Sequence, residues 1–413
     1  MRDQHPAVPG SISTARRWWL LTVGLIATLS ATVFINGIAF LIPALDAERG
    51  ISLAEAGFLS SMPSLGTVLT LIGWGYLTDR VGERLVLTLG LGLTGSAALA
   101  AALVPTSIMF EAPCLFAGGM AAASANTASG RLVTGWFPPD QRGLAMGIRQ
   151  TAQPLGIALA ALVLPQLGER DFSVALFFPA AVCAASAVIS AVSVKDPPRR
   201  SPKTAPAAEL LNPYRGNSTL WRIHLASALL MVPQTVVLTF MLVWLIEDHH
   251  WSVGSAGVLV STSQLLGAVG RIGAGRWSDR VGSRMGPIRL IAVGAALVMV
   301  ALAISDRLDS VLAVPLMVVA AVITVLDNGL AFTAIPEIAG PYWSGRAMGA
   351  QNTTQRLTSG VGPPVFGEVI DVSGYPLAFA LCGMAALAAL PVVPRDVRSA
   401  ESADASSDGP NGR

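Results

Sequence analysis

Long apolar blocks recur along the whole 413-residue chain and constrain its fold more than any other feature. The first runs from 18 to 45, and the blocks match the roughly 20 residues with which a helix crosses the hydrocarbon core of a membrane. Only 13% of the residues are charged, against roughly 25% in soluble domains. Short segments of alternating polarity, which are typical of membrane barrels, are missing. The chain is therefore expected to be an all-α integral membrane protein.

The block boundaries predict twelve transmembrane helices in two sets of six, at 18–45, 54–77, 85–105, 109–135, 143–166 and 172–193, then 220–246, 253–275, 288–305, 311–335, 345–370 and 374–393. A stretch rich in proline and basic residues separates the sets and is expected to be a solvated linker. The expected parts are a cytoplasmic N-terminus, an N-terminal bundle, the cytoplasmic linker, a C-terminal bundle and a disordered cytoplasmic tail, at 1–17, 18–194, 195–219, 220–393 and 394–413.

Basic residues are distributed unevenly between the loops on the two sides of the membrane. The linker and the loops after the second and eighth predicted helices are rich in basic residues, whereas the loops on the opposite side carry only Arg49, Arg170 and Arg307. Because cytoplasmic loops are enriched in Lys and Arg, both termini are expected to be cytoplasmic in a multi-pass protein of the cell inner membrane. This topology explains the arginines, and no aromatic residues are interleaved with them, so no nucleic-acid partner is predicted.

A ten-residue motif, G-x-x-x-D-R-x-G-x-R, occurs at 75–84 and again at 275–284, 200 residues later. A second correspondence joins 145–147 with 347–349 and extends from the pair Asn126 and Asn328 to the pair Gln153 and Gln355. The motif glycines permit a tight turn and close helix approach, and Asp79 can face the positive N-terminal end of a neighbouring helix. The alternative is that the motif marks only a short basic cytoplasmic loop.

With this duplicated motif the sequence resembles the major facilitator superfamily, over residues 18 to 393. The resemblance implies two pseudo-symmetric six-helix bundles, a substrate site near the midplane and alternating access. By similarity, the motif residues, among them Asp79 and Arg84, form a cytoplasmic latch that stabilises the outward-facing state. The latch residues so implied are Gly75, Asp79, Arg80, Gly82, Arg84, Gly275, Asp279, Arg280, Gly282 and Arg284.

Charged residues inside the apolar helices indicate a pathway or a partner, because each costs roughly 2.5–3.5 kcal/mol to insert. Three are cations, at Arg149, Arg271 and Arg356, and Asp327 is the chief acid opposed to them. Helical spacing is expected to put each cation on one face with a polar neighbour. The predicted substrate-binding set is Arg271, Arg356, Arg149, Gln264, Asn352, Gln153 and Asn36.

Each of these charges has a purely structural alternative. Arg271 could bond backbone carbonyls, and Arg149 could extend to the membrane surface or act in gating. Asp327 is the candidate for proton coupling, but an ion pair with a nearby arginine explains it equally well.

Guanidinium groups bind carboxylates bidentately, so the cations predict a small organic anion, mono- or dicarboxylate-like, as the substrate. Arg271 lies eight residues before Asp279, and this spacing resembles that of monocarboxylate and oxalate-type transporters. The acid that accompanies the arginine in the monocarboxylate group is replaced by Val260. Proton symport is expected because it makes transport of a monoanion electroneutral.

Two other functions stay open. One is proton-driven efflux of drugs or metabolites, although Ala160 and Ala161 replace the Gly-Pro pair of the antiporter signature. The other is a membrane sensor or enzyme on a transporter scaffold, and no nucleotide or zinc motif supports an enzyme. The three cysteines lie in apolar blocks without metal-ligand spacing, so no cofactor or metal is predicted. The expected partners are the substrate, protons and the lipid bilayer, and the chain is expected to be monomeric.

Overall fold

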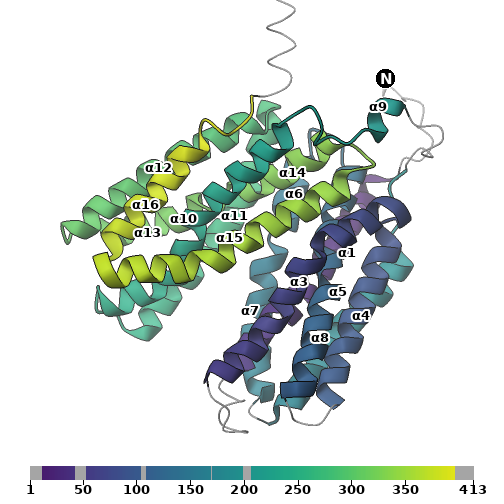
Figure 1. Ribbon diagram of the computed structural model, residues 1–413, viewed down its shortest axis with the longest axis horizontal. Helices are drawn as coiled ribbons and strands as arrows, with labels where there is room; N and C mark the ends of the chain where they lie inside the picture. The colour runs from purple at the N-terminus through teal and green to yellow at the C-terminus, as the bar shows by residue number, and fades with distance from the viewer. Residues whose placement is uncertain (1–11, 42–52, 104–107, 169, 199–205, 396–413) are drawn as a thin grey trace, which may run out of the picture. The chain divides into compact units, whose positions relative to one another are not determined.

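The computed structural model describes residues 12–41, 53–103, 108–168, 170–198 and 206–395, and in these ranges every regular element is a helix (Figure 1). The first half contains α1 (Thr14–Gly37), η1 (Ile38–Leu41), α3 (Leu53–Val81), α4 (Glu83–Leu103), α5 (Ile108–Trp136), α6 (Arg142–Arg149), α7 (Ala152–Gly168) and α8 (Phe172–Ser193). Then follow α9 (Ala207–Leu210), α10 (Thr219–Glu247), α11 (Val253–Val281), α12 (Met285–Arg307), α13 (Ala313–Ile323), α14 (Asp327–Ala339), α15 (Ser344–Ser373) and α16 (Tyr375–Ala389).

The helices confirm the all-α prediction, and each predicted transmembrane block contains helix. Eight helical stretches of the described chain are long and apolar enough to span a membrane. The helices α3, α11 and α15 are 29, 29 and 30 residues long but are not among these eight. The predicted extension of the first helix beyond Leu41 and the predicted tail beyond Arg395 lie outside the described residues.

Two of the predicted helices are interrupted. The predicted helix 143–166 is divided into α6 and α7 at Gln150 and Thr151. Pro154 explains the break, because it has no N–H to donate to the carbonyl of Gln150 four residues earlier. The predicted helix 311–335 is divided into α13 and α14, in a segment where Val325 and Leu326 donate to carbonyls only three residues back.

The helices form two compact units whose boundaries differ from the predicted bundles. Unit 1 comprises Met1–Pro138, Leu155–Leu211 and Gly340–Arg346, and unit 2 comprises Pro139–Pro154, Asn212–Ala339 and Ala347–Arg413. Each unit therefore includes a short segment from the other half of the sequence. Both segments contain a helix start that is held by a motif aspartate, as described below.

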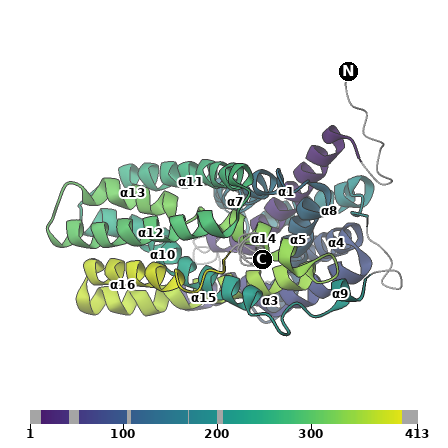
Figure 2. The same cartoon turned by 90° about the horizontal axis from the view of Figure 1, so that it is seen from above.

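In unit 1, small residues bring the helices close together. α5 packs against α1, α3 and α4, and α8 packs against α1 and α4 (Figures 1 and 2). A side chain at Gly66 of α3 would collide with the backbone of Phe116 in α5. The hydroxyl groups of Thr67 and Thr70 also donate to α5 carbonyls, at 3.0 and 2.7 Å. In a membrane the hydrophobic effect does not drive helices together, because lipid tails are as apolar as the side chains. Close backbone contact and hydrogen bonds of this kind hold the helices together instead.

In unit 2, α16 packs against α10 and α12, and a buried cluster that includes Trp244, Met299 and Phe379 joins them. The described part of the predicted linker also belongs to this packing. The hydroxyl of Tyr214 lies 2.9 Å from Nε2 of His224 in α10, and Nδ1 of His224 lies 2.7 Å from the amide oxygen of Gln351 in α15. Burial raises the pKa of Tyr214 to about 12. The linker is thus anchored at Tyr214 instead of being solvated throughout.

The close approach of α3 and α5 can be tested with two glycines of the same helix. Gly66→Ala is expected to lower the free energy of unfolding by about 1–3 kcal/mol, because the new methyl group meets backbone that cannot move aside. Gly73→Ala is the matched control, since nothing lies within 4 Å of its Cβ position. Thermal unfolding of the two variants in detergent measures the difference, and equal melting temperatures would contradict this packing.

Candidate functional site

The first motif aspartate binds the start of a helix. Oδ1 of Asp79 accepts a hydrogen bond from the backbone N–H of Gly345 at 2.8 Å. Its Oδ2 accepts from the backbone N–H and the Nε of Arg346, both at 3.0 Å. These N–H groups belong to the first turn of α15, where the helix carries its positive end and lacks internal acceptors.

Buried charges around Asp79 complete what we call the first cluster, formed by Asp79, Glu83, Arg131 and Arg346. Arg131 of α5 is 4% exposed and lies 3.3 Å from both Asp79 and Glu83. It also donates to the carbonyls of Thr78 and Pro341, at 2.8 and 3.0 Å. Two acids and two arginines balance each other, which a buried cluster of charges requires.

The second motif aspartate forms an equivalent site in unit 2. Asp279 accepts from the backbone N–H groups of Gly143 and Leu144 at 2.9 and 2.8 Å, at the start of α6. Arg284 lies 2.7 Å from Asp279 and 3.3 Å from Glu337. Arg142 also lies 3.3 Å from Glu337. We call Asp279, Glu337, Arg284 and Arg142 the second cluster.

Electrostatics within the second cluster favour the charged form of its central arginine. Burial lowers the pKa of Arg284, but the carboxylates of Glu337 and Asp279 outweigh this effect, so the pKa lies above its ordinary value. Arg284 therefore stays cationic throughout the physiological range.

The two clusters are equivalent in geometry but draw a key arginine from different elements. Arg284 donates to the carbonyl of Pro139 at 2.8 Å, and Arg131 donates to the corresponding Pro341. The motif counterpart of Arg284 is Arg84, but its Nε donates to the carbonyl of Ala191 at 2.7 Å. The structure therefore does not bring Arg84 to Asp79. Arg131 occupies the equivalent place.

The remaining predicted latch residues divide into backbone and surface positions. Added side chains at Gly75 and Gly275 would collide with the backbones of Gly345 and Gly143, so these motif glycines allow each helix start to approach its aspartate. Gly82 and Gly282 have φ values of 100° and 67°, which suit glycine at helix ends. Arg80 and Arg280 are exposed and stay outside the two clusters.

The predicted substrate cation Arg271 lies at the break between α6 and α7. Its Nη1 donates to the carbonyl of Gln150 at 3.2 Å, which is the carbonyl that Pro154 leaves without an N–H. The Nε of Arg271 is buried and has no hydrogen-bond partner in the described ranges. Asp327 is near enough for electrostatic attraction, but among the described residues the two form no salt bridge. The carbonyl of Gln150 thus uses only one of the N–H donors of Arg271, and other N–H groups of this guanidinium have no described acceptor.

The other two cations differ from each other in their surroundings. Arg149 is 2% exposed, donates to the amide oxygen of Gln150 at 2.7 Å and packs over the ring of Phe332. It is buried within unit 2, so the alternative that it extends to the membrane surface is wrong. Arg356 is half-buried on α15 and has no hydrogen bond or ion pair with any residue that the structure describes.

A chain of three amides crosses unit 2 next to these charges. Gln355 donates to Asn328 at 2.9 Å, and Asn328 donates to Gln234 at 2.9 Å, so α15, α14 and α10 are linked. Gln355 directly precedes Arg356, and Asn328 directly follows Asp327. The predicted site did not include this chain. The repeat correspondence that pairs Asn126 with Asn328 and Gln153 with Gln355 was the available signal.

The predicted polar partners are only partly gathered with the cations. Gln264 and Asn352 belong to unit 2, but Asn352 donates to the carbonyl of Met348 on its own helix, at 2.9 Å. Asn36 belongs to unit 1. Gln153 is exposed beyond the helix break, so the expectation that it shares a continuous helix face with Arg149 is wrong. Within the described ranges, no three His, Cys, Asp or Glu side chains are grouped as metal ligands.

The chain has several helices long and apolar enough to span a membrane and repeats the same helix-start site in its two halves. It belongs to the Major Facilitator Superfamily, whose family model matches residues 24–363. The chain is 60% identical over 372 residues to the uncharacterized MFS-type transporter Rv2994 of Mycobacterium tuberculosis, across 90% of this chain and 83% of that protein.

More distant similarities agree with this family. The chain is 26% identical over 376 residues to the probable sulfoacetate transporter SauU of Cupriavidus necator, across 84% of this chain and 86% of that protein. The solved structure of the proton:xylose symporter XylE matches with a TM-score of 0.74 at 15% identity, across 92% of this chain and 95% of that chain. The last comparison shows a shared fold.

The difference in the origin of the central arginine, Arg131 in the first cluster and Arg284 in the second, leads to a stability prediction. Arg131→Gln and Arg284→Gln are each expected to destabilise the protein by about 3 kcal/mol, because each leaves buried carboxylates without their cation. Arg84→Gln is the control and is expected to cost less than about 1 kcal/mol, since Arg84 is exposed. Thermal unfolding in detergent measures all three. A larger effect of Arg84→Gln than of Arg131→Gln would contradict the assignment.

Proposed function

We propose that this transporter moves a small organic anion, mono- or dicarboxylate-like, across the cell membrane by alternating access and with proton coupling. The observation that carries the proposal is the pair Arg271 and Arg356 in unit 2, neither of which forms a salt bridge with a described carboxylate. Buried cations are costly unless an anion compensates them. An anionic substrate supplies that compensation.

Hydrogen bonding around Arg271 favours a charged ligand over a neutral one. The guanidinium group offers five N–H donors, and its one described hydrogen bond is to the uncharged carbonyl of Gln150. A carboxylate accepts two parallel hydrogen bonds from such a group, and charge-assisted bonds are roughly twice as strong as neutral ones. Arg356 and the amide chain of Gln355, Asn328 and Gln234 provide further donors for the rest of the substrate.

Asp327 is the proposed proton carrier. It lies in the first turn of α14 and is attracted to Arg271. A bound anion and an ionised Asp327 would compete for the same cation, so substrate binding favours the protonated acid. Binding of the anion and of a proton are then coupled, and transport of a monoanion with one proton moves no net charge.

Comparisons and charge distribution support the substrate class and the orientation. The relative SauU is named for sulfoacetate, which is an organic anion. The arginine-rich motif loops are expected on the cytoplasmic side, which puts both termini there in an inner-membrane protein. In this proposal the two charge clusters form the cytoplasmic latch of the outward-facing state.

Uptake into proteoliposomes tests the substrate class. The panel contains monocarboxylates, dicarboxylates, sulfonates and neutral sugars, under an imposed pH gradient. Accumulation of at least one organic anion, with no accumulation of the sugars, is expected. Extrusion of cationic dyes without transport of any anion would instead establish drug efflux and overturn the proposal.

Variants of the two arginines test the site. Arg271→Gln and Arg356→Gln are each expected to weaken substrate affinity by about tenfold to a hundredfold, because each removes hydrogen bonds between charged groups. Arg276→Gln, at an exposed position later on α11, is the matched control and should transport normally. Substrate affinity is measured by initial uptake rates, on protein shown to be folded by size-exclusion chromatography. Normal affinity in both variants would refute this site.

Asp327→Asn tests proton coupling separately from binding. The amide cannot exchange a proton, so proton flux driven by substrate should be lost while the exchange of internal for external substrate continues. A pH-sensitive dye inside the proteoliposomes records the proton flux. Flux that stays at the level of the unaltered protein would make Asp327 a structural residue.

A further inference from the structure

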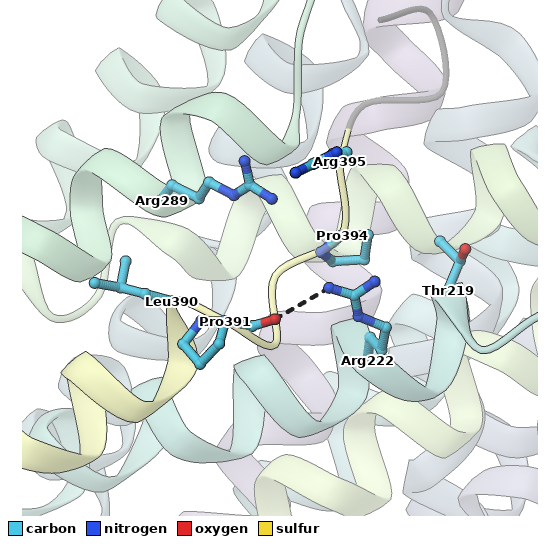
Figure 3. Close-up of a pocket in the computed structure, with 7 residues that line it drawn as sticks. All are labelled: Thr219, Arg222, Arg289, Leu390, Pro391, Pro394 and Arg395. Atoms are coloured by element: carbon cyan, nitrogen blue, oxygen red, sulfur yellow. Dashed lines mark hydrogen bonds between the residues drawn. The ribbon is translucent and has the colours of Figure 1, made fainter. Parts of the chain in front are cut away.

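A basic pocket lies in unit 2, and neither of the proposed substrate arginines lines it. It has a volume of about 680 Å³ and is lined by Arg222 of α10, Arg289 of α12 and Arg395, together with Thr219, Pro391 and Pro394 (Figure 3). Three arginines from three separate segments turn toward it, and none of the described residues that line it is acidic. The pocket therefore concentrates positive charge.

Hydrogen bonds to the chain do not neutralise this charge. Arg222 donates to the carbonyls of Val392, Pro391 and Val393, at 2.9, 3.1 and 3.3 Å. Arg289 donates to the carbonyl of Val393 at 2.9 Å, and its buried Nε has no partner among the described residues. Carbonyls are uncharged, so no described carboxylate compensates these three like charges. An anion with several acceptor oxygens fits a group of three arginines, and phosphate has these oxygens and is bound bidentately by guanidinium groups.

Apolar helix faces lead away from the pocket. One and two turns after Arg289 on α12, Val293 and Leu297 are 38% and 65% exposed. On α10, Trp221 lies next to Arg222 and is 60% exposed, and tryptophan is enriched at the membrane interface. Cationic groups near the starts of α10 and α12, followed by exposed apolar side chains, match the two ends of a phospholipid.

We propose that this pocket binds the phosphate group of an anionic phospholipid, whose acyl chains lie along the exposed faces of α10 and α12. The phosphate bonds Arg289 and Arg395, and Arg222 adds charge while it holds the segment after α16. The bound lipid joins the starts of α10 and α12 to the end of α16. The site is independent of the substrate and of proton coupling.

Native mass spectrometry of the full chain in detergent tests the proposal, with dioleoylphosphatidylglycerol, dioleoylphosphatidylcholine and inorganic phosphate as probes. The phosphatidylglycerol is expected to bind more tightly than the phosphatidylcholine. Arg289→Gln with Arg395→Gln should weaken the phosphatidylglycerol affinity about 25-fold, or about fivefold per arginine. Arg276→Gln, at an exposed position outside the pocket, is the matched control and should leave the affinity unchanged.

The single variant Arg395→Gln is expected to fold normally, because the Arg395 side chain has no hydrogen bond to described residues. It therefore tests lipid binding even if the double variant misfolds. It should still weaken lipid binding about fivefold. Unchanged phosphatidylglycerol affinity in the double variant would overturn the proposal. Equal binding of phosphatidylcholine would also overturn it. Binding of inorganic phosphate without lipid binding would assign the pocket to a soluble phosphate compound and would overturn the lipid assignment.

Discussion

Each motif aspartate accepts two backbone N–H groups from the first turn of a helix that lies far from it in the sequence. The rest of the structure depends on this interaction. It assigns Gly340–Arg346 to unit 1 and Pro139–Pro154 to unit 2, so each compact unit includes part of the other half of the chain. A carboxylate at a helix N-terminus is favourable anywhere, but here it is buried with arginines that balance its charge. Both halves of the repeat contain a motif aspartate bound to a helix start in this way.

The two clusters contain the same charges but not the same residues. Asp79 is paired with Arg131 from α5, and Asp279 is paired with Arg284 from the motif itself. Glu83 and Glu337, which supply the second acid, also come from different helices. In each cluster one arginine contacts the motif aspartate and donates to a proline carbonyl. An arginine can fill this role from α5 or from the motif. Alignment of the repeats alone would therefore assign the role of Arg284 to Arg84, which lies elsewhere.

Helix existence was predictable because the membrane requires long apolar helices, and the described helices confirm it. Pro154 marks a bend in the predicted helix 143–166, but the sequence does not show that the helix divides there into α6 and α7 or that Arg271 bonds the carbonyl of Gln150. The geometry of the motif aspartate followed from helix electrostatics. The acid that each arginine contacts could not be predicted. Arg131 and Arg284 contact their acids through the packing of different helices, and the spacing of residues along one helix does not show that packing. Helical spacing likewise could not show that Gln355, Asn328 and Gln234 bond one another across three helices.

One consequence of Pro154 concerns selectivity. Because the proline frees the carbonyl of Gln150 and Arg271 bonds it, this carbonyl is an internal competitor of any ligand for the guanidinium group. In the proposed function, a ligand must exchange with that carbonyl, so its affinity depends on the difference between two hydrogen bonds. A neutral hydroxyl or carbonyl compound gains almost nothing from this exchange, whereas an anion gains the charge-assisted part. In the proposed function, a proline on one helix would thereby allow an arginine on another to favour anions over uncharged solutes.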